Sequence, residues 1–120
     1  MFIALARHKV NLPESGLIYQ ITKQINNNLK NALLKEIAAD MGYSPRHPER
    51  LLLKKAGCTF SDILQKLRMD KAAQLLIETD YTLEQIADMT GYRAEAGFYK
   101  RFRLVFGTTP NHYRKSHTAV

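Results

Sequence analysis

Apolar residues recur every three or four positions along most of this chain, and polar or turn-forming residues separate the stretches. This period is typical of amphipathic helices. A first helix is predicted from Leu17 through Ile21 and Ile25, and it fades in Asn26-Asn27-Asn28. Further helices are predicted at about 34–41, from Ser44 to Gly57, from Phe60 to Glu78, after Thr82, between Gly91-Tyr92 and Gly107, and from Pro110. The pattern predicts an all-α fold of about seven helices.

Small polar residues and glycines mark the ends of these predicted helices. A Ser or Thr side chain can accept a backbone N–H at a helix start, and glycine can adopt the positive φ that ends a helix. The expected caps are Ser44, Thr59 with Asp62, Thr82 with Gln85, and Thr109 ahead of Pro110, and the expected stops are Gly57 and Gly107.

Two stretches, Leu34–Gly57 and Leu83–Gly107, carry the same features in the same order. Each has Ile-Ala, then Gly-Tyr, then a basic helical stretch and a closing glycine. The interval from Ile to Gly-Tyr is five residues in both, and the closing glycine follows after fifteen residues in one and sixteen in the other. Each stretch reads as helix, tight turn, helix, which is a helix-turn-helix. The alternative is an ordinary helical hairpin without a nucleic-acid partner.

Charge favours the nucleic-acid interpretation. The 120 residues carry 18 Lys and Arg against 11 Asp and Glu, a net charge of +7, and a basic domain is drawn to polyanions. The alternative is a soluble, positively charged surface. However, the charge is unevenly placed, because the first helix of each stretch is mainly acidic and the second is basic. The second helices carry Arg46, Arg50, Lys54 and Lys55 in one stretch and Arg93, Lys100, Arg101 and Arg103 in the other.

The helix predicted from Phe60 to Glu78 connects the two stretches, and its apolar stripe is interpreted as core. At about 1.5 Å per residue it spans roughly 28 Å. One turn of B-DNA is about 34 Å. Such a helix is long enough to hold two reading helices in successive major grooves on one face of a duplex.

Other classes of protein are disfavoured. The single cysteine, Cys58, permits neither a disulfide framework nor a cysteine zinc site, and the four histidines show no ligand spacing. No phosphate-binding loop or catalytic triad is suggested, so we expect no enzyme activity, metal or cofactor. No stretch reaches the roughly 18 apolar residues of a membrane span. A reduced, cytoplasmic setting is expected for one unpaired cysteine.

The second stretch and its flanks resemble the AraC/XylS family of bacterial transcription regulators. The resemblance covers about residues 17–115, including Leu34–Gly57 and the connecting helix with Leu67-Arg68-Met69 and Ala72. It is specific because many spaced residues occur in fixed order. These are Ile86-Ala87, Gly91-Tyr92, Phe98, Lys100, Phe102, Arg103, Phe106-Gly107, Thr109-Pro110 and Tyr113-Arg114.

The resemblance implies a DNA-binding domain that places two recognition helices in adjacent major-groove segments and acts near promoters through RNA polymerase. The family's base-reading positions fall on Arg46, Glu49, Arg50, Glu95, Ala96 and Lys100. Arg50 and Lys100 suit guanine, and Glu49 or Glu95 suits cytosine N4. Phosphate or structural contacts are expected from Lys54, Arg68, Arg103 and Arg114.

Three positions depart from the family pattern. Leu33 replaces the usual Ser or Thr cap, and Ala96 lacks the polar side chain often found at its position. Pro48 stands at an apolar core position inside the first recognition helix, where it removes a backbone donor. We therefore expect that helix to begin near Pro48 or to be distorted, with Arg46 and His47 in the turn. The half-site read by Lys100 and Glu95 should then be better defined than the half-site that faces Arg46 and Arg50.

The expected organisation is an arm or linker at 1–16, a helix-turn-helix subdomain at 17–57, the connecting helix at 58–79, a second subdomain at 80–116 and a tail at 117–120. A ligand-binding or dimerisation domain, usual in the family, is not expected within this chain. The chain is either one domain of a longer regulator or a small stand-alone member. Two alternative functions are a protein-interaction domain that kept the fold with weak DNA binding, and a basic module for RNA or anionic membranes. The operator, the effector, the oligomeric state and the choice between activation and repression do not follow from the sequence.

Overall fold

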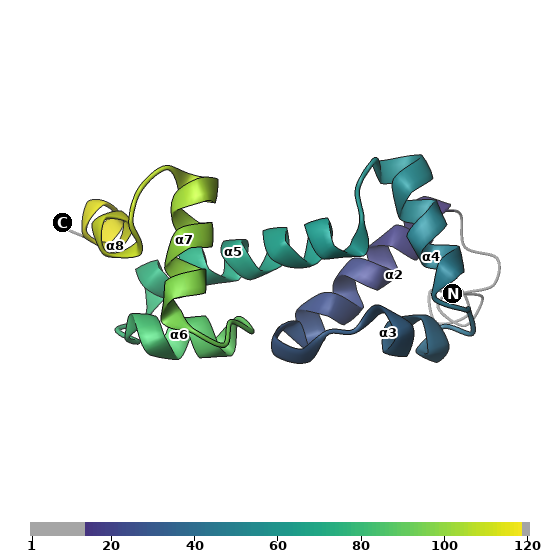
Figure 1. Cartoon of the computed structure of the whole chain (residues 1–120), viewed down its shortest axis with the longest axis horizontal. Helices are drawn as coiled ribbons and strands as arrows, with labels where there is room; N and C mark the ends of the chain where they lie inside the picture. Colours follow the sequence, from purple (N-terminus) through teal and green to yellow (C-terminus); the bar gives the residue numbers. More distant parts are fainter. Residues whose placement is uncertain (1–13, 119–120) are drawn as a thin grey trace, which may run out of the picture. The chain divides into compact units, whose positions relative to one another are not determined.

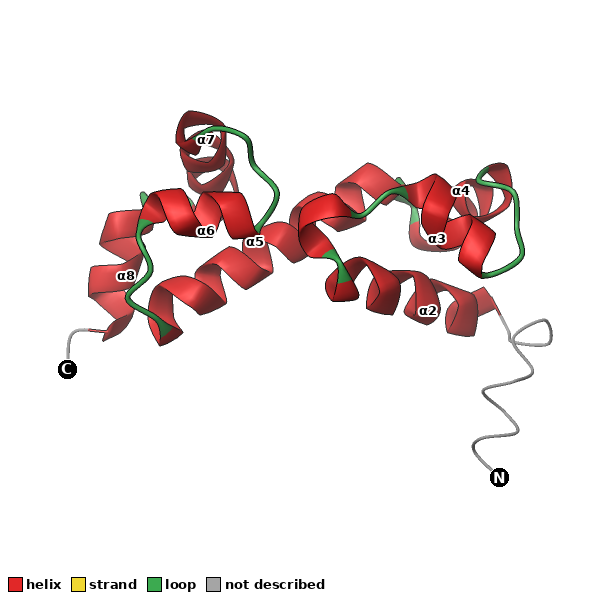
Figure 2. Ribbon diagram, turned by 90° about the horizontal axis from the view of Figure 1, so that it is seen from below, coloured by secondary structure: helices red, strands yellow, loops and turns green. Residues whose placement is uncertain are grey.

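The computed structural model describes residues 14–118, and within that range every regular element is helical (Figures 1 and 2). The predicted all-α fold is confirmed. The α-helices are α2 (Glu14–Asn27), α3 (Leu34–Asp40), α4 (Arg46–Leu51), α5 (Phe60–Glu78), α6 (Leu83–Met89), α7 (Glu95–Phe106) and α8 (Pro110–Thr118). A 3-10 turn, η2, covers Leu29–Asn31, and a π-helical turn, η3, covers Leu52–Ala56.

The described residues form two compact units. The first unit includes α2, α3, α4, η3 and the start of α5 up to Leu64. The second unit includes η2 and the chain from Gln65 onward, so the short turn between α2 and α3 belongs with the later helices. The subdomain limits expected from the sequence remain predictions.

The core of the first unit forms around α2. Its apolar row, Leu17, Ile21 and Ile25, is buried and faces α3, α4 and η3. These elements contribute Ile37 and Ala38 from α3, and Pro48, Leu51 and Leu52 from the later helix. The spacing of the α2 residues explains this packing, because positions three or four apart share one side of a helix.

The core of the second unit forms where α6 and α7 pack against α5 (Figure 1). Phe98 and Phe102 of α7 are fully buried, and the Phe102 ring also contacts Phe106 and the Tyr113 ring of α8. Phe106 packs against this core, whereas the neighbouring Val105 is exposed. The other buried members are Met69, Ala72, Ala73, Leu75, Leu76, Ile86 and Ala87.

Most helix ends lie where the sequence predicts them. α5 runs from Phe60 to Glu78, and Thr59 and Asp62 exchange two hydrogen bonds of 3.0 Å at its start. Thr82 and Gln85 form the corresponding capping box of α6. The Thr109 hydroxyl accepts the His112 N–H ahead of α8, and Gly57 and Gly107 have positive φ. These ends depend on neighbours within a few residues, which explains why sequence alone predicts them.

The first helix begins earlier than predicted, at Glu14 instead of Leu17. Gly16 therefore lies within α2 and does not end a tail. The buried row that begins at Leu17 stabilises this helix. The remaining arm, residues 1–13, and residues 119–120 lie outside the described residues.

The expected start of the first recognition helix near Pro48 is wrong. Helix α4 begins at Arg46, so Arg46 and His47 are helical and do not lie in the turn. In a regular helix the N–H of residue 48 would bond the Ser44 carbonyl, but proline has no N–H. The Ser44 carbonyl accepts the His47 N–H instead, at 3.2 Å. This tighter first turn removes the need for a Pro48 donor, and Pro48 is buried. No side chain caps this start, contrary to the expectation for Ser44. The helix is nevertheless irregular, because it continues as the π-helical η3.

Candidate nucleic-acid interface

The two turns between paired helices have the same backbone hydrogen bonds. In the first, the Tyr43 N–H bonds the Ala38 carbonyl at 2.8 Å and the Gly42 N–H bonds that of Ala39 at 3.0 Å. In the second, the Tyr92 and Gly91 N–H groups bond the Ala87 and Asp88 carbonyls at 2.9 and 3.0 Å. Gly42 and Gly91 have φ of 83° and 92°. Both turns are Schellman motifs, for which glycine is preferred, so the sequence repeat is also a structural repeat.

The helices after the turns are in register when counted back from their closing glycines. Pro48 and Phe98 lie nine residues before Gly57 and Gly107, and both are buried. Leu52 and Phe102, five residues before those glycines, are buried as well. The one-residue difference between the repeats therefore falls in the turn. Arg50 and Lys100 occupy equivalent exposed positions in this register.

The structure leaves most of the predicted base-reading side chains exposed. On α7, Glu95, Ala96 and Lys100 are exposed while Phe98 and Phe102 anchor the buried side. On α4, Arg46 and Arg50 are exposed, but Glu49 is partly covered.

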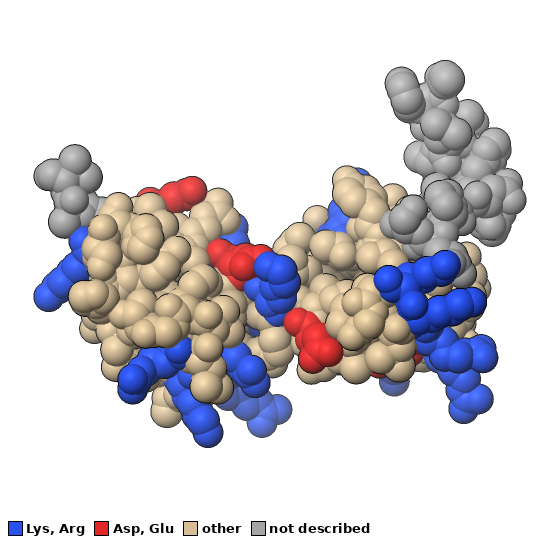
Figure 3. All heavy atoms as spheres, turned by 90° about the horizontal axis from the view of Figure 1, so that it is seen from above, with Lys and Arg blue, Asp and Glu red and all other residues tan. Residues whose placement is uncertain are grey.

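Further basic side chains extend these surfaces. Lys54 on η3 and Arg103 on α7 are exposed. In Figure 3, Lys and Arg side chains project from the surface of each unit.

Arg68 and Arg114, two of the four residues assigned to phosphate or structural contacts, bond backbone carbonyls. Arg114 donates to the carbonyls of Leu76, Thr79 and Tyr81 at 2.8 to 3.1 Å, and so satisfies the C-terminal end of α5. Arg68 donates to the carbonyls of Leu29 and Lys30, each at 3.2 Å. Because both side chains are partly covered, their geometry favours the structural role.

Tyr99 of α7 is a further candidate for the interface, in addition to the residues predicted from the sequence. It lines a shallow groove on α7 with Lys100, Arg103 and Leu104. Its register partner in the first unit is Glu49, eight residues before the closing glycine. Leu104 is 68% exposed, so this face combines cations with apolar surface. The alignment of the two helices depends on knowing that Pro48 and Phe98, and Leu52 and Phe102, are the buried residues.

Within residues 14–118, no group of three or more His, Cys, Asp or Glu side chains is placed to hold a metal ion. In the same range, no helix is long and apolar enough to cross a membrane. Cys58 is a free, partly buried cysteine.

Comparison with known proteins agrees with this geometry. A family model described as a helix-turn-helix domain matches residues 37–116. The probable transcription factor PqrA of Proteus vulgaris is 35% identical over 95 residues, which cover 79% of this chain and 75% of PqrA. The chain belongs to the AraC/XylS family.

Other AraC/XylS relatives extend the comparison. The transcriptional activator NphR of a Rhodococcus species is 30% identical over 118 residues, covering 97% of this chain but 35% of NphR. The crystal structure of an AraC-type regulator from Chromobacterium violaceum is 27% identical with a TM-score of 0.78, covering 82% of this chain and 89% of that one. The chain is accordingly a DNA-binding helix-turn-helix transcription regulator, a non-enzymatic class of protein.

Proposed function

We propose that this AraC/XylS-family chain reads promoter DNA with two recognition helices, α4 continued by η3, and α7. The proposal rests on the structural repeat. The two turns have the same backbone hydrogen bonds, and each is followed by a helix with two buried residues at the same distances from its closing glycine. The opposite face of each helix exposes basic side chains. In a helix-turn-helix, the second helix enters the major groove. Two such helices would read two adjacent major-groove segments.

The exposed residues suit distinct tasks in this proposal. Lys100 and Arg50 donate to guanine O6 and N7, while Glu95 and Glu49 accept from cytosine N4. Arg46 is a further donor, and the Ala96 methyl suits contact with a thymine methyl group. Lys54 and Arg103 neutralise phosphates, which positions the helices without reading sequence.

The biological setting is part of the proposal. PqrA is named a probable transcription factor and NphR a transcriptional activator. By analogy, the chain would act in the bacterial cytoplasm at promoters, through contacts with RNA polymerase. A ligand-binding or dimerisation domain elsewhere in a longer protein would supply its regulation.

Selection from random duplex DNA tests the proposal, followed by binding of variants to the selected site and to a scrambled one. Lys100→Ala should lose preference at one base pair, because a base contact discriminates by about 1–3 kcal/mol. Lys71→Ala is the matched control, since it removes the same charge from an exposed position on α5.

The expected control result is a similar small loss of affinity for both DNAs. If Lys100→Ala weakens binding to the selected and scrambled sites equally, Lys100 does not read a base. If no site is enriched, or if single strands and anionic vesicles bind as tightly as duplex, the proposal of sequence-specific reading is wrong.

A further inference from the structure

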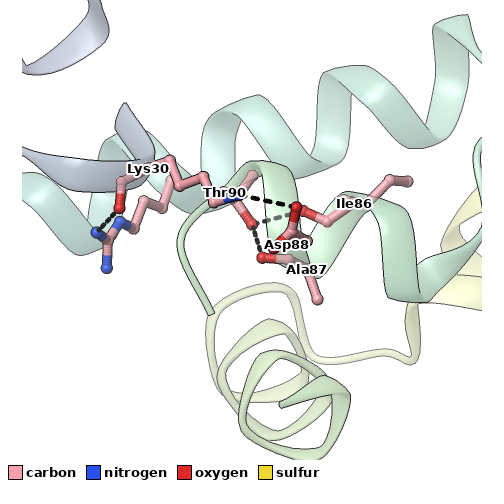
Figure 4. Close-up of polar contacts among 6 residues, drawn as sticks. Lys30, Ile86, Ala87, Asp88 and Thr90 are labelled. Atoms are coloured by element: carbon pink, nitrogen blue, oxygen red, sulfur yellow. Dashed lines mark hydrogen bonds and ion pairs between the residues drawn. The ribbon is translucent and has the colours of Figure 1, made fainter. Parts of the chain in front are cut away.

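Within the second unit, the side chains of Arg68 and Lys30 connect the 3-10 turn η2 to α5 and α6. Arg68 of α5 donates Nε–H to the Leu29 carbonyl and Nη2–H to the Lys30 carbonyl, each at 3.2 Å. The Lys30 ammonium group also pairs with the Asp88 carboxylate at 2.9 Å. Figure 4 shows the Lys30 side chain extending to this end of α6. The surface ion pair contributes little by itself, whereas the planar guanidinium holds two carbonyls in fixed geometry.

The same guanidinium lies against the turn before α7. A Cβ built on Gly91 would lie 2.6 Å from Arg68 Nη2 and 2.7 Å from Cζ, so any side chain there would force the guanidinium to move. Arg68 Cζ lies 5.9 Å from the centre of the Tyr92 ring, within the range of a cation–π contact. We call Arg68, Leu29, Lys30, Gly91 and Tyr92 the Arg68 cluster.

Tyr92 connects this cluster to the recognition helix. Its hydroxyl donates to the Gln65 side chain, which fixes the ring against α5. Its ring packs edge-on against Phe98, with centroids 5.7 Å apart. Phe98 is fully buried and anchors α7. A path of direct contacts therefore runs from Arg68 through Tyr92 to the helix that carries Lys100.

The turn of the first unit has no comparable support among the described residues. No described atom lies within 4 Å of the position that a Cβ on Gly42 would take. Tyr43 instead stacks on His47 of its own α4, with ring centroids 4.5 Å apart. The backbone bonds of the two turns are equivalent, so the guanidinium is an addition specific to the second.

Burial affects the pKa of both titratable partners of this contact. Burial lowers the pKa of Arg68, and the nearby Tyr92 opposes that change. Burial also raises the pKa of Tyr92, while the positive charges of Arg68 and Arg101 lower it. The guanidinium stays charged at neutral pH because its ordinary pKa is far above 7, and its bonded donors are directed at protein carbonyls.

We propose that Arg68 is a positioning residue for base reading by α7 and not a ligand of the DNA backbone. It fixes the Gly91-Tyr92 turn, and through Tyr92 and Phe98 it fixes the direction in which α7 presents Lys100 and Glu95. This inference rests on the proposed reading of bases by α7. It predicts that sequence preference in one half-site depends on a side chain that touches no DNA.

Amide hydrogen exchange tests the cluster without DNA. In Arg68→Ala, exchange at the Tyr92 N–H should accelerate at least about tenfold, because two charge-assisted hydrogen bonds are lost. Exchange at the equivalent Tyr43 N–H should not change. Arg68→Lys should resemble Arg68→Ala, since an ammonium group cannot span both carbonyls in this geometry. Equal acceleration at both amides would indicate global destabilisation, and no acceleration would show that the cluster does not hold the turn. Either result would overturn the proposal.

DNA binding distinguishes positioning from phosphate contact. With the chain folded at low temperature, Arg68→Ala should reduce discrimination at the base pairs read by α7 about tenfold, a large part of what one base contact supplies. Discrimination in the other half-site should persist. The slope of log K against log salt should stay unchanged, whereas loss of one phosphate contact makes this negative slope shallower by about 0.9.

The remaining outcomes are decisive as well. A shallower salt dependence in Arg68→Ala, with Arg68→Lys restoring binding, would make Arg68 a phosphate ligand and overturn the proposal. Unchanged discrimination in Arg68→Ala would also overturn it. If the wild-type chain itself shows no sequence preference, the proposed function fails, and the exchange experiment still decides whether Arg68 holds the turn.

Discussion

Gly42 and Gly91 show how two equivalent residues acquire different constraints. Both need a positive φ to end a helix in a Schellman turn, which a side chain makes unfavourable. Gly91 has a second constraint that Gly42 lacks: the Arg68 guanidinium occupies the space that a Cβ at position 91 would need. Because that guanidinium is held by two carbonyls, it cannot move away without losing hydrogen bonds.

Alanine at the two positions should therefore have unequal effects on stability. Gly42→Ala should cost about 1–2 kcal/mol of unfolding free energy for the left-handed backbone. Gly91→Ala should cost about 2 kcal/mol more, of the order of one charge-assisted hydrogen bond. Urea unfolding measures both. In an Arg68→Ala background the extra cost of Gly91→Ala should disappear, and equal costs in the wild-type background would contradict the anchored guanidinium.

The first helices of the two repeats, α3 and α6, differ mainly at their starts. α6 has the capping box of Thr82 and Gln85, in which each side chain bonds the other residue's backbone N–H. α3 has Leu33 at the same position, extended and 52% exposed, without a side-chain cap. Both helices contain seven residues, a length at which the cap is a large part of local stability. The α3 start is thus a weak point that tertiary packing has to offset.

Replacing Leu33 with serine should stabilise the chain by about 0.5–1 kcal/mol. Glu36 stands three residues on, so Leu33→Ser creates the sequence of a capping box. Thermal unfolding measures the effect, and Leu33→Ala is the matched control because it removes the same exposed apolar surface without adding a cap. A serine variant no more stable than the alanine variant would show that the start of α3 gains nothing from a side-chain cap.

At the scale of the whole molecule, the net charge of +7 would attract DNA through the Lys and Arg side chains exposed on each unit. Within the two repeats, acidic residues belong mainly to the first helices, as Glu36 and Asp40 or Glu84 and Asp88. The second helices carry the exposed Arg46, Arg50, Lys54, Lys100 and Arg103. Binding should therefore displace counterions from both regions of contact.

Duplex affinity should fall steeply with salt. For roughly five to eight phosphate contacts, log K against log salt should have a slope of about −4 to −7. Fluorescence anisotropy over a salt series, with single strands and anionic vesicles beside the duplex, measures it. Lys54→Gln should make the slope shallower by about 0.9 if that residue contacts phosphate. A wild-type slope near zero would exclude binding dominated by phosphate contacts.

The sequence determined what depends on near neighbours. The extents of α3, α5 and α6, the capping boxes at Thr59 and Thr82, and the four glycine turns and stops all follow from residues a few positions apart. The repeat and the charge indicated a basic helix-turn-helix, and the resemblance of the spaced residues from Ile86 to Arg114 to the AraC/XylS signature predicted the family. These features are local, so hydrogen bonding and helical periodicity fix them before any long-range contact forms.

Only the tertiary structure decided how certain side chains are used. Arg68 and Arg114 reach carbonyls 35 to 39 residues away for most of their bonds, a separation that no local pattern encodes. Pro48 is accommodated because the Ser44 carbonyl accepts the His47 N–H and the proline ring is buried in the core of the first unit. The equivalence of Glu49 with Tyr99 likewise follows from which residues are buried. In each case the outcome depends on elements distant in sequence that pack together, and packing selects which of several locally acceptable arrangements is adopted.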